Sequence, residues 1–333
     1  MKVFITGVAG FLGSHIADAM LKLGHEVAGV DNLLGGYRDN VPAGVSFVEA
    51  DCCDWNRMEA LMTGADLVYH TAATAYEGLS VFSPALVTHH IVDASVTVFS
   101  AAIAAKVKRI VHCSSMARYG AAIAPFRETM TCQPQDPYGI AKLCSEQILR
   151  NLAAVHNMDF VIAVPHNIIG PRQKYDDPYR NVASIMMNLM MQNRSPVIYG
   201  DGHQQRCFSF VGDCLSCLVK MGTASNVVGH TINIGPDEQP MTVNSLYRAI
   251  AEVVGFEGEP TYMPARPQEV KVALCSSEKA RRMLDYKTST TLMDGLRSMH
   301  AWMKFRGVKA FNYHLPLEIV NEKTPETWAK RLF

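Results

Sequence analysis

A glycine-spaced turn near the N-terminus constrains the fold of this chain more than any other feature. The segment 7–13, Gly-Val-Ala-Gly-Phe-Leu-Gly, stands between a β-rich apolar run, Val3–Thr6, and a stretch with helical spacing, Phe11–Leu23. Glycines at such a place permit a tight turn and let backbone N–H groups at a helix N-terminus approach a pyrophosphate. Between a strand and an amphipathic helix, this spacing predicts a dinucleotide site. Its contacts are expected to be Gly7, Gly10, Phe11, Leu12 and Gly13.

Short apolar runs alternate with helical stretches through the first half of the chain. Repeated β-α units with nearly continuous apolar strands predict a doubly wound parallel sheet, a Rossmann-type α/β fold, over residues 1–166. One helix is expected to have Asp136 as its N-cap and Pro137 at its first position. Further strands are expected at Val27–Val30, Ser46–Val48, Leu67–His70, Arg109–Cys113 and Phe160–Val164, and long helices at Pro84–Ala105 and Asp136–His156.

The regular alternation of strands and helices ends after residue 166, where prolines separate shorter elements. We therefore expect a smaller C-terminal α/β domain over residues 167–333 that binds the substrate, with some later segments returning to the first domain. The Met-rich stretch Ser184–Gln192 has the apolar spacing of a buried helix. The tail, Phe311–Phe333, has no evident chemical role, and packing or dimer formation is the function we expect for it.

Charge and cysteine content exclude several classes of function. The chain has 333 residues with 31 Lys+Arg against 31 Asp+Glu and no long basic block, which argues against binding to nucleic acid or an anionic membrane. No apolar run was expected to approach the roughly 18 residues that span a bilayer, and no signal-peptide core is evident, so a cytoplasmic location is expected. Nine cysteines are irregularly spaced. Cys214-x-x-Cys217 follows Asp213, the expected N-cap of a helix, and packed thiols are favoured over a metal site.

The ends of the second, third and fourth strands carry residues suited to a dinucleotide. Asp31 ends the second strand, where a carboxylate can accept hydrogen bonds from ribose hydroxyls and would repel a 2′-phosphate, so NAD is favoured over NADP. Asp51 could hold the adenine amino group or cap a helix. Small residues after the fourth strand would let the dinucleotide lie against the strand ends. The expected contacts are Asp31, Asn32, Asp51, Cys52, Ala72 and Ala73.

Candidate catalytic residues follow the fifth strand. Ser114-Ser115 ends it, and Tyr138-x-x-x-Lys142 opens the next helix. Tyr and Lys four residues apart share one helical face, so the ammonium can lower the pKa of the phenol. About 0.5 such pairs are expected by chance in a chain of this composition, so the motif alone is weak evidence. Its position after a strand-end Ser pair is what supports a catalytic role.

Together the glycine turn, Asp31, Ser115 and Tyr138-x-x-x-Lys142 resemble the extended short-chain dehydrogenase/reductase family, in the branch that acts on nucleotide sugars. The resemblance covers nearly the whole chain and is greatest to UDP-glucose 4-epimerases. It implies that Tyr138, as phenolate, takes the proton of the sugar 4-hydroxyl directly or through Ser115. NAD would accept the C4 hydride, and the 4-keto ring would turn over and receive the hydride on its other face.

The resemblance also implies a set of substrate contacts. Two asparagines would hold the sugar nucleotide, a tyrosine would pack near the uracil, and two arginines would neutralise the diphosphate. A wall residue beside the sugar 2-position is small here, which implies that UDP-N-acetylglucosamine is accepted as well as UDP-glucose. These residues are, in that order, Asn167, Asn181, Tyr199, Arg206, Arg266 and Ala273.

Departures from the family pattern bear on the reaction. Met116 and Ala117 follow the catalytic Ser115, where dehydratases and decarboxylases of this branch carry an acid, so those reactions lose their proton carrier. The lysine that many 4-epimerases carry near Thr74-Ala75-Tyr76 is absent. In the next helix, Ile91 occupies the position of the usual asparagine. These two changes leave the anchoring of cofactor and sugar open.

Three readings remain. The leading one is an NAD-dependent nucleotide-sugar 4-epimerase that acts on UDP-sugars. The second is a nucleotide-sugar 4-keto reductase or another epimerase of the branch, and the third is a nucleotide-sensing protein without catalysis. The resemblance further implies a homodimer, in which Pro84–Ala105 and Asp136–His156 pair with their copies.

Overall fold

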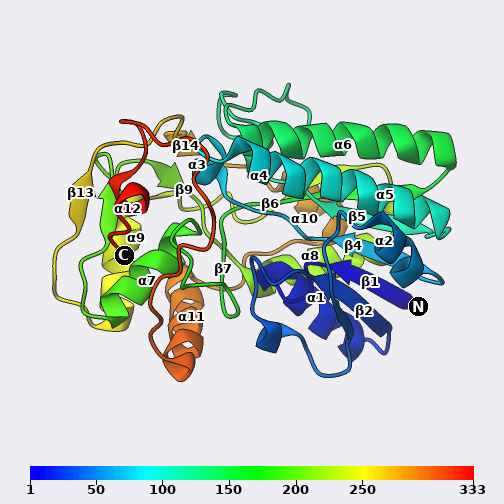
Figure 1. Cartoon of the computed structure of the whole chain (residues 1–333), viewed down its shortest axis with the longest axis horizontal. Coiled ribbons are helices and arrows are strands. Elements are labelled where there is room, and N and C mark those ends of the chain that lie inside the picture. The colour runs from blue at the N-terminus through cyan, green and yellow to red at the C-terminus, as the bar shows by residue number, and fades with distance from the viewer.

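A seven-stranded parallel sheet lies at the centre of the computed structural model, which describes residues 1–333 (Figure 1). The strand order β11-β6-β5-β4-β1-β2-β3 reverses direction at β1, as doubly wound folds do. This confirms the predicted Rossmann-type fold. The strands are β1 (Lys2–Thr6), β2 (Glu26–Asp31), β3 (Ser46–Glu49), β4 (Leu67–His70), β5 (Arg109–Cys113), β6 (Asp159–Pro165) and β11 (Thr231–Ile234).

Helices cover both faces of the sheet because successive strand residues point to opposite sides. Along β1, Val3 and Ile5 pack under one layer and Phe4 packs under the other. The first layer contains α1 (Phe11–Lys22), α8 (Val211–Thr223) and α10 (Glu278–Leu284), and the second contains α2 (Trp55–Met62), α5 (Ala94–Ala104) and α6 (Pro137–His156). Helices α8 and α10, from the second half of the chain, thus lie against the main sheet, and β11 is one of its strands.

The predicted N-terminus of α6 is confirmed. Asp136 caps it by accepting a hydrogen bond from the Gly139 backbone N–H at 2.8 Å, and Pro137 occupies the first position. This helix lies beside a long helical segment formed by α4 (Pro84–Thr88), a π-helical turn (His89–Asp93) and α5 (Figure 1).

The long segment corrects one expectation from the sequence. Pro84–Ala104 has 21 residues, and its most apolar 18-residue stretch has a mean hydropathy of 1.4, enough by length and composition to cross a membrane. Its most apolar stretch is 44% buried, and α5 packs against α2 and α6 here. The long helix itself was predicted over Pro84–Ala105, but the polar pair His89-His90 interrupts its apolar run in the sequence.

The second part of the molecule is built around another apolar cluster. The predicted Met-rich helix is confirmed as α7 (Val182–Met191), with Met186, Met187 and Met190 buried against α9 (Val243–Val254) and α11 (Leu292–Arg306). Short strands surround these helices: β7 (Ile168–Ile169), β8 (Val197–Tyr199), β9 (Gln205–Arg206), β10 (Ser209–Phe210), β12 (Met241–Thr242), β13 (Thr261–Met263) and β14 (Val272–Ala273).

The predicted N-cap role of Asp213 is wrong. Helix α8 begins two residues earlier, at Val211, and Asp213 lies in its first turn. Its carboxylate instead accepts hydrogen bonds from the backbone N–H groups of Ser289 and Thr290, at 3.2 and 3.0 Å. The two thiols of Cys214 and Cys217 are free and buried, and no group of three potential ligands is placed to hold a metal ion.

Candidate functional site

A cavity of about 460 Å³ opens between the carboxyl ends of the main sheet strands and the second part of the molecule. Every predicted catalytic, cofactor-binding and substrate-binding residue, from Gly7 to Ala273, lines its wall. In doubly wound sheets this edge is where ligands bind, because the loops that leave the strands diverge there. The cavity therefore brings the nucleotide, catalytic and substrate candidates together.

The glycine turn is packed too closely for any other residue. Gly7 has φ +73°, and a Cβ there would lie 2.8 Å from the backbone N of Ala72. A Cβ on Gly13 would lie 2.2 Å from the carbonyl O of Gly7. The turn thus brings its bare backbone to the cavity at the start of α1, which is the arrangement that a pyrophosphate needs. These residues fit an NAD site.

Two carboxylates mark the far end of this nucleotide side. Asp31 is buried, and its oxygens accept hydrogen bonds from the backbone N–H groups of Ala9 at 3.0 Å and Leu33 at 2.7 Å. Burial raises the pKa of Asp31, and these hydrogen bonds oppose the rise. Asp51 accepts from the Asn32 side chain at 3.0 Å. The alternative role of Asp51 as a helix cap is wrong, because Asp54 caps α2.

The Tyr–Lys pair lies at the centre of the cavity wall. The Lys142 ammonium donates to the Cys113 carbonyl at 2.9 Å, and burial lowers the pKa of Lys142 to about 8. Burial raises the pKa of Tyr138, while a hydrogen bond with Ser115 lowers it. A positive charge brought beside Tyr138 would favour its phenolate strongly in this dry setting. The geometry suits a proton acceptor that is activated only when the site is filled.

The two predicted substrate asparagines differ in how their side chains are hydrogen-bonded. Asn167, at φ +44°, donates from its side chain to the Cys207 carbonyl at 3.1 Å and faces the cavity. Asn181 caps α7, its side-chain oxygen accepting from the Ala183 N–H at 2.9 Å. The amide of Asn181 donates only a 3.5 Å contact, to the Ile168 carbonyl. Its carboxamide is thus held in place by the helix that it begins.

Arg206 and Arg266 also line the cavity. The Arg266 guanidinium lies over the Tyr199 ring, 4.9 Å from its centroid, and pairs with Glu269 at 3.2 Å. Arg206 on β9 is in register with Ala273 on the neighbouring strand β14. Two cations that face one hollow suit an anionic group such as a diphosphate.

Sequence reasoning missed three charged residues of the cavity: Glu77, Arg180 and Glu269. Arg180 donates to the Gly35 carbonyl at 3.1 Å, lies over the Tyr76 ring and is 4.0 Å from Asp177. Its position next to Asn181, a predicted contact, was the only available signal. Arg180 brings a cation to the Tyr76 segment, where the family lysine is absent.

Glu77 begins the short helix α3 (Glu77–Ser80), and its backbone carbonyl accepts a hydrogen bond from the Ser80 hydroxyl at 2.7 Å. The residue is exposed, and its carboxylate, which forms no hydrogen bond or ion pair, lines the cavity. Partial desolvation in the cavity, together with the charge of Asp136, raises the pKa of Glu77 to about 7, against the opposing effect of Arg206 and Arg266. The other departure, Ile91, packs with Tyr138 in an apolar cluster, so it supports the helix that carries the tyrosine.

We expect Glu77→Gln to stabilise the protein in a pH-dependent way. The folded chain keeps the Glu77 proton up to a pH near 7, whereas the unfolded chain loses it near 4.5, so ionisation of Glu77 costs stability progressively between these values. Because Glu77 is exposed to the cavity, water screens most of this cost, and the amide should raise the free energy of unfolding by at most about 1 kcal/mol at pH 8 and by less at pH 5. Urea titrations at pH 5 and pH 8 measure the free energy of unfolding. An equal increase at the two pH values, or an increase in the surface control Glu252→Gln, would refute the prediction.

Comparison with known proteins gives a consistent result. A family model described as the NAD dependent epimerase/dehydratase family matches residues 3–235. The UDP-glucose 4-epimerase of Mycolicibacterium smegmatis is 30% identical over 311 residues, covering 89% of this chain and 96% of that protein. A UDP-N-acetyl-α-D-glucosaminuronate decarboxylase of Bacillus cytotoxicus is 26% identical, covering 91% of this chain and 98% of that protein.

Solved structures agree with the sequence relatives. The crystal structure of UDP-glucose 4-epimerase from Thermotoga maritima with UDP-glucose is similar with a TM-score of 0.85 at 29% identity, covering 92% of this chain and 99% of that chain. The UDP-N-acetylglucosamine 4-epimerase of Methanobrevibacter ruminantium, in complex with UDP-N-acetylmuramic acid, has a TM-score of 0.85 at 28% identity, with the same coverage of 92% and 99%.

Proposed function

Because this chain belongs to the NAD dependent epimerase/dehydratase family, and is therefore an enzyme with NAD as its cofactor, we propose that it inverts C4 of a UDP-hexose through a transient 4-keto sugar. The observation that carries the proposal is a single cavity whose lining includes Tyr138 and Ser115 together with the two arginines, Arg206 and Arg266. A diphosphate held at the arginines would extend its sugar toward the tyrosine.

The chain's own residues account for the proton and for the anchoring. Tyr138, as phenolate, accepts the proton of the 4-hydroxyl, and Ser115 is placed to pass it or to hold the oxygen. NAD, when bound, accepts the hydride of C4 and returns it. Arg206 and Arg266 hold the diphosphate while the keto ring turns, which keeps the sugar in the cavity. Lys142, whose ammonium donates to the Cys113 carbonyl at 2.9 Å, would add positive charge to the same cavity.

Two features favour a neutral hexose and C4 inversion over the other reactions of the family. Met116 and Ala117 follow Ser115 and can neither donate nor accept a proton, so no acid stands where dehydration or decarboxylation would use one. The Glu77 carboxylate, which has no hydrogen-bond or ion-pair partner, would repel the carboxylate of a uronic acid in the same cavity. A neutral sugar avoids this repulsion and can donate hydroxyl hydrogen bonds to Glu77.

The purified protein, incubated with UDP-glucose and no added nucleotide, tests this function. Proton NMR should show UDP-galactose accumulating until the two sugars reach equilibrium, because the hydride returns to the sugar that gave it. Turnover that consumes added NADH instead would indicate a 4-keto reductase. A UDP-hexose that is bound but returned unchanged would contradict the proposal.

The pocket beside the sugar 2-position is expected to admit an acetamido group. Ala273 is buried on the cavity wall, in register with Arg206, and its methyl group leaves room that a phenol ring would fill. Ala273→Tyr should lower kcat/KM for UDP-N-acetylglucosamine about 100-fold and change that for UDP-glucose by much less. The matched control is Val272→Tyr, on the exposed neighbouring residue. Equal loss on both sugars, or no turnover of the acetamido sugar by the parent, would contradict this reading.

We also propose a homodimer through α4–α5 and α6. The two helical segments lie side by side, and Ile140 on α6 leaves 54% of its surface exposed. Pairing with a second copy would form a four-helix interface that covers such apolar side chains. Light scattering should give about twice the chain mass of 36.7 kDa. The mass of a single chain at working concentration would remove the proposal.

A further inference from the structure

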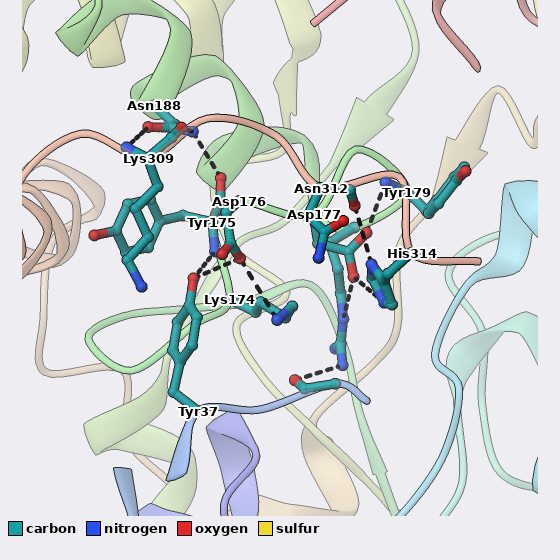
Figure 2. Close-up of polar contacts among 12 residues, drawn as sticks. Tyr37, Lys174, Tyr175, Asp176, Asp177, Tyr179, Asn188, Lys309, Asn312 and His314 are labelled. Carbon is teal, nitrogen blue, oxygen red and sulfur yellow. Dashed lines mark hydrogen bonds and ion pairs between the residues drawn. The ribbon is translucent and has the colours of Figure 1, made fainter. Parts of the chain in front are cut away.

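The C-terminal segment Val308–Phe333, which we call the C-terminal strap, runs from the end of α11 across the substrate side of the molecule (Figure 1). Its first anchor is α7. The Asn188 side chain donates to the Lys309 carbonyl at 2.9 Å and accepts from the Lys309 N–H at 3.3 Å. The Asn312 N–H then donates to the Asp176 carbonyl at 2.8 Å. Figure 2 shows these contacts around the loop that carries Asp176 and Asp177.

A second anchor ties the strap to the nucleotide-binding side. The Glu318 N–H donates to the Phe82 carbonyl at 2.9 Å. The Glu318 carboxylate accepts from the backbone N–H groups of Ala85 and Leu86, at 2.9 and 2.8 Å, in the first turn of α4. A carboxylate at a helix N-terminus is stabilised by the free N–H groups there. The strap therefore connects the two parts of the molecule along one side of the cavity.

The strap ends in the short helix α12 (Glu326–Ala329), which lies directly behind the substrate wall. The hydroxyl of Thr327, which is fully buried, forms a hydrogen bond with the hydroxyl of Tyr199. The Trp328 ring, also buried, donates from Nε1 to the Pro178 carbonyl at 3.0 Å. A Cβ built on Gly78 would lie 3.4 Å from this ring and 3.3 Å from Arg266 Nη1, so Trp328 and Arg266 converge on one spot.

These contacts form a chain that ends at a substrate contact. Thr327 fixes the hydroxyl end of Tyr199, the Tyr199 ring supports the Arg266 guanidinium, and Arg266 is oriented by Glu269 at 3.2 Å. A phenol held at both ends has one orientation, and a guanidinium stacked on it has its fork aimed in one direction. Neither Thr327 nor Trp328 lines the cavity itself.

We propose that the C-terminal strap completes the nucleotide-sugar site, with Thr327 as a positioning residue that holds Tyr199 and, through it, Arg266 ready for the uridine diphosphate. The proposal rests on the proposed function for the identity of the nucleotide. The C-terminal strap would therefore contribute to substrate affinity and take no part in the proton and hydride chemistry. Loosening the strap should therefore affect KM and leave kcat unchanged.

The test uses the full chain with NAD bound and three single variants. Thr327→Val keeps the shape and removes the hydroxyl, Thr327→Ser keeps the hydroxyl, and Thr324→Val changes a second buried strap threonine. Calorimetry with UDP and kinetics with UDP-glucose are measured for each. Thr327→Val should raise the Kd of UDP and the KM of UDP-glucose about three- to tenfold, with kcat within about twofold of the parent. Thr327→Ser should restore both values, and Thr324→Val should leave them unchanged.

A double-mutant cycle keeps the test decisive if a single variant is unstable. Tyr199→Phe removes the same hydrogen bond from the other side, so the double variant with Thr327→Val should bind UDP no more weakly than the weaker single variant. Additive losses, a fall in kcat at unchanged KM, or an equal loss in Thr327→Ser would overturn the proposal. UDP binding does not depend on turnover. A parent that binds UDP but epimerises no UDP-hexose would therefore refute the proposed function and leave the strap inference to be judged on affinity.

Discussion

Tyr138→Phe is expected to lower kcat for UDP-glucose by about 10³-fold or more, because the phenyl ring keeps the packing of the tyrosine and cannot accept the proton of the 4-hydroxyl. The ring is buried among Val87, Ile91 and Ala141, so removal of one oxygen should leave the fold intact. Steady-state kinetics give the loss, and calorimetry with UDP should show a Kd within about twofold of the parent, since UDP lacks the sugar whose hydroxyl Tyr138 would contact.

The control for this variant is Tyr262→Phe, which removes the hydroxyl of an exposed tyrosine outside the cavity. It should retain the kcat of the parent. If Tyr138→Phe also retained activity within about tenfold while NAD stayed bound, the phenolate would not be the general base. The assignment of Tyr138 to the proton step would then be wrong.

Gly13→Ala is expected to abolish NAD binding. The added methyl group would lie 2.2 Å from the Gly7 carbonyl and 2.9 Å from the Thr71 hydroxyl, so the turn must move away from the end of β4. We expect the variant to be purified with little or no NAD and to lose about 2–4 kcal/mol of unfolding free energy, as for other forced overlaps in a packed region. Absorbance of extracted nucleotide and urea titration measure the two effects.

Gly24→Ala provides the comparison, because this glycine has φ +79° and open space around its would-be Cβ. It should cost about 1 kcal/mol through backbone strain alone and leave NAD bound. Retention of NAD by Gly13→Ala at the level of the Gly24 variant would show that the close packing of the turn is not required for the dinucleotide.

Much of the fold could be predicted because its signals are local. Strands β4 and β5 have the predicted bounds, and the cap of α6 is set by Asp136 and the proline after it. Strand β11 was not predicted, because Thr231–Ile234 is a short apolar run whose pairing with β6 joins segments far apart in the sequence. The helix start at Val211 was missed for a related reason, since the partners of Asp213 lie at residues 289 and 290.

The candidate site divides in the same way. The glycine turn and the Tyr–Lys pair are visible in the sequence because a short motif carries each of them. Glu77 and Arg180 were missed because their surroundings arise only when distant segments meet: the Tyr76 hydroxyl donates to Asp177 at 2.6 Å across 101 residues. The same holds for Thr327, which acts on Tyr199 from a tail that carries no motif of its own.

The central claim is that the hydride removed from C4 returns to C4 of the same sugar inside this cavity. Incubation with UDP-glucose deuterated at C4, in ordinary water and without added NAD, tests it most directly. The account predicts UDP-galactose that keeps its deuterium at C4 throughout the approach to equilibrium, as followed by NMR and mass spectrometry. UDP-galactose that has lost its label to solvent, or no UDP-galactose from protein that retains NAD, would contradict it.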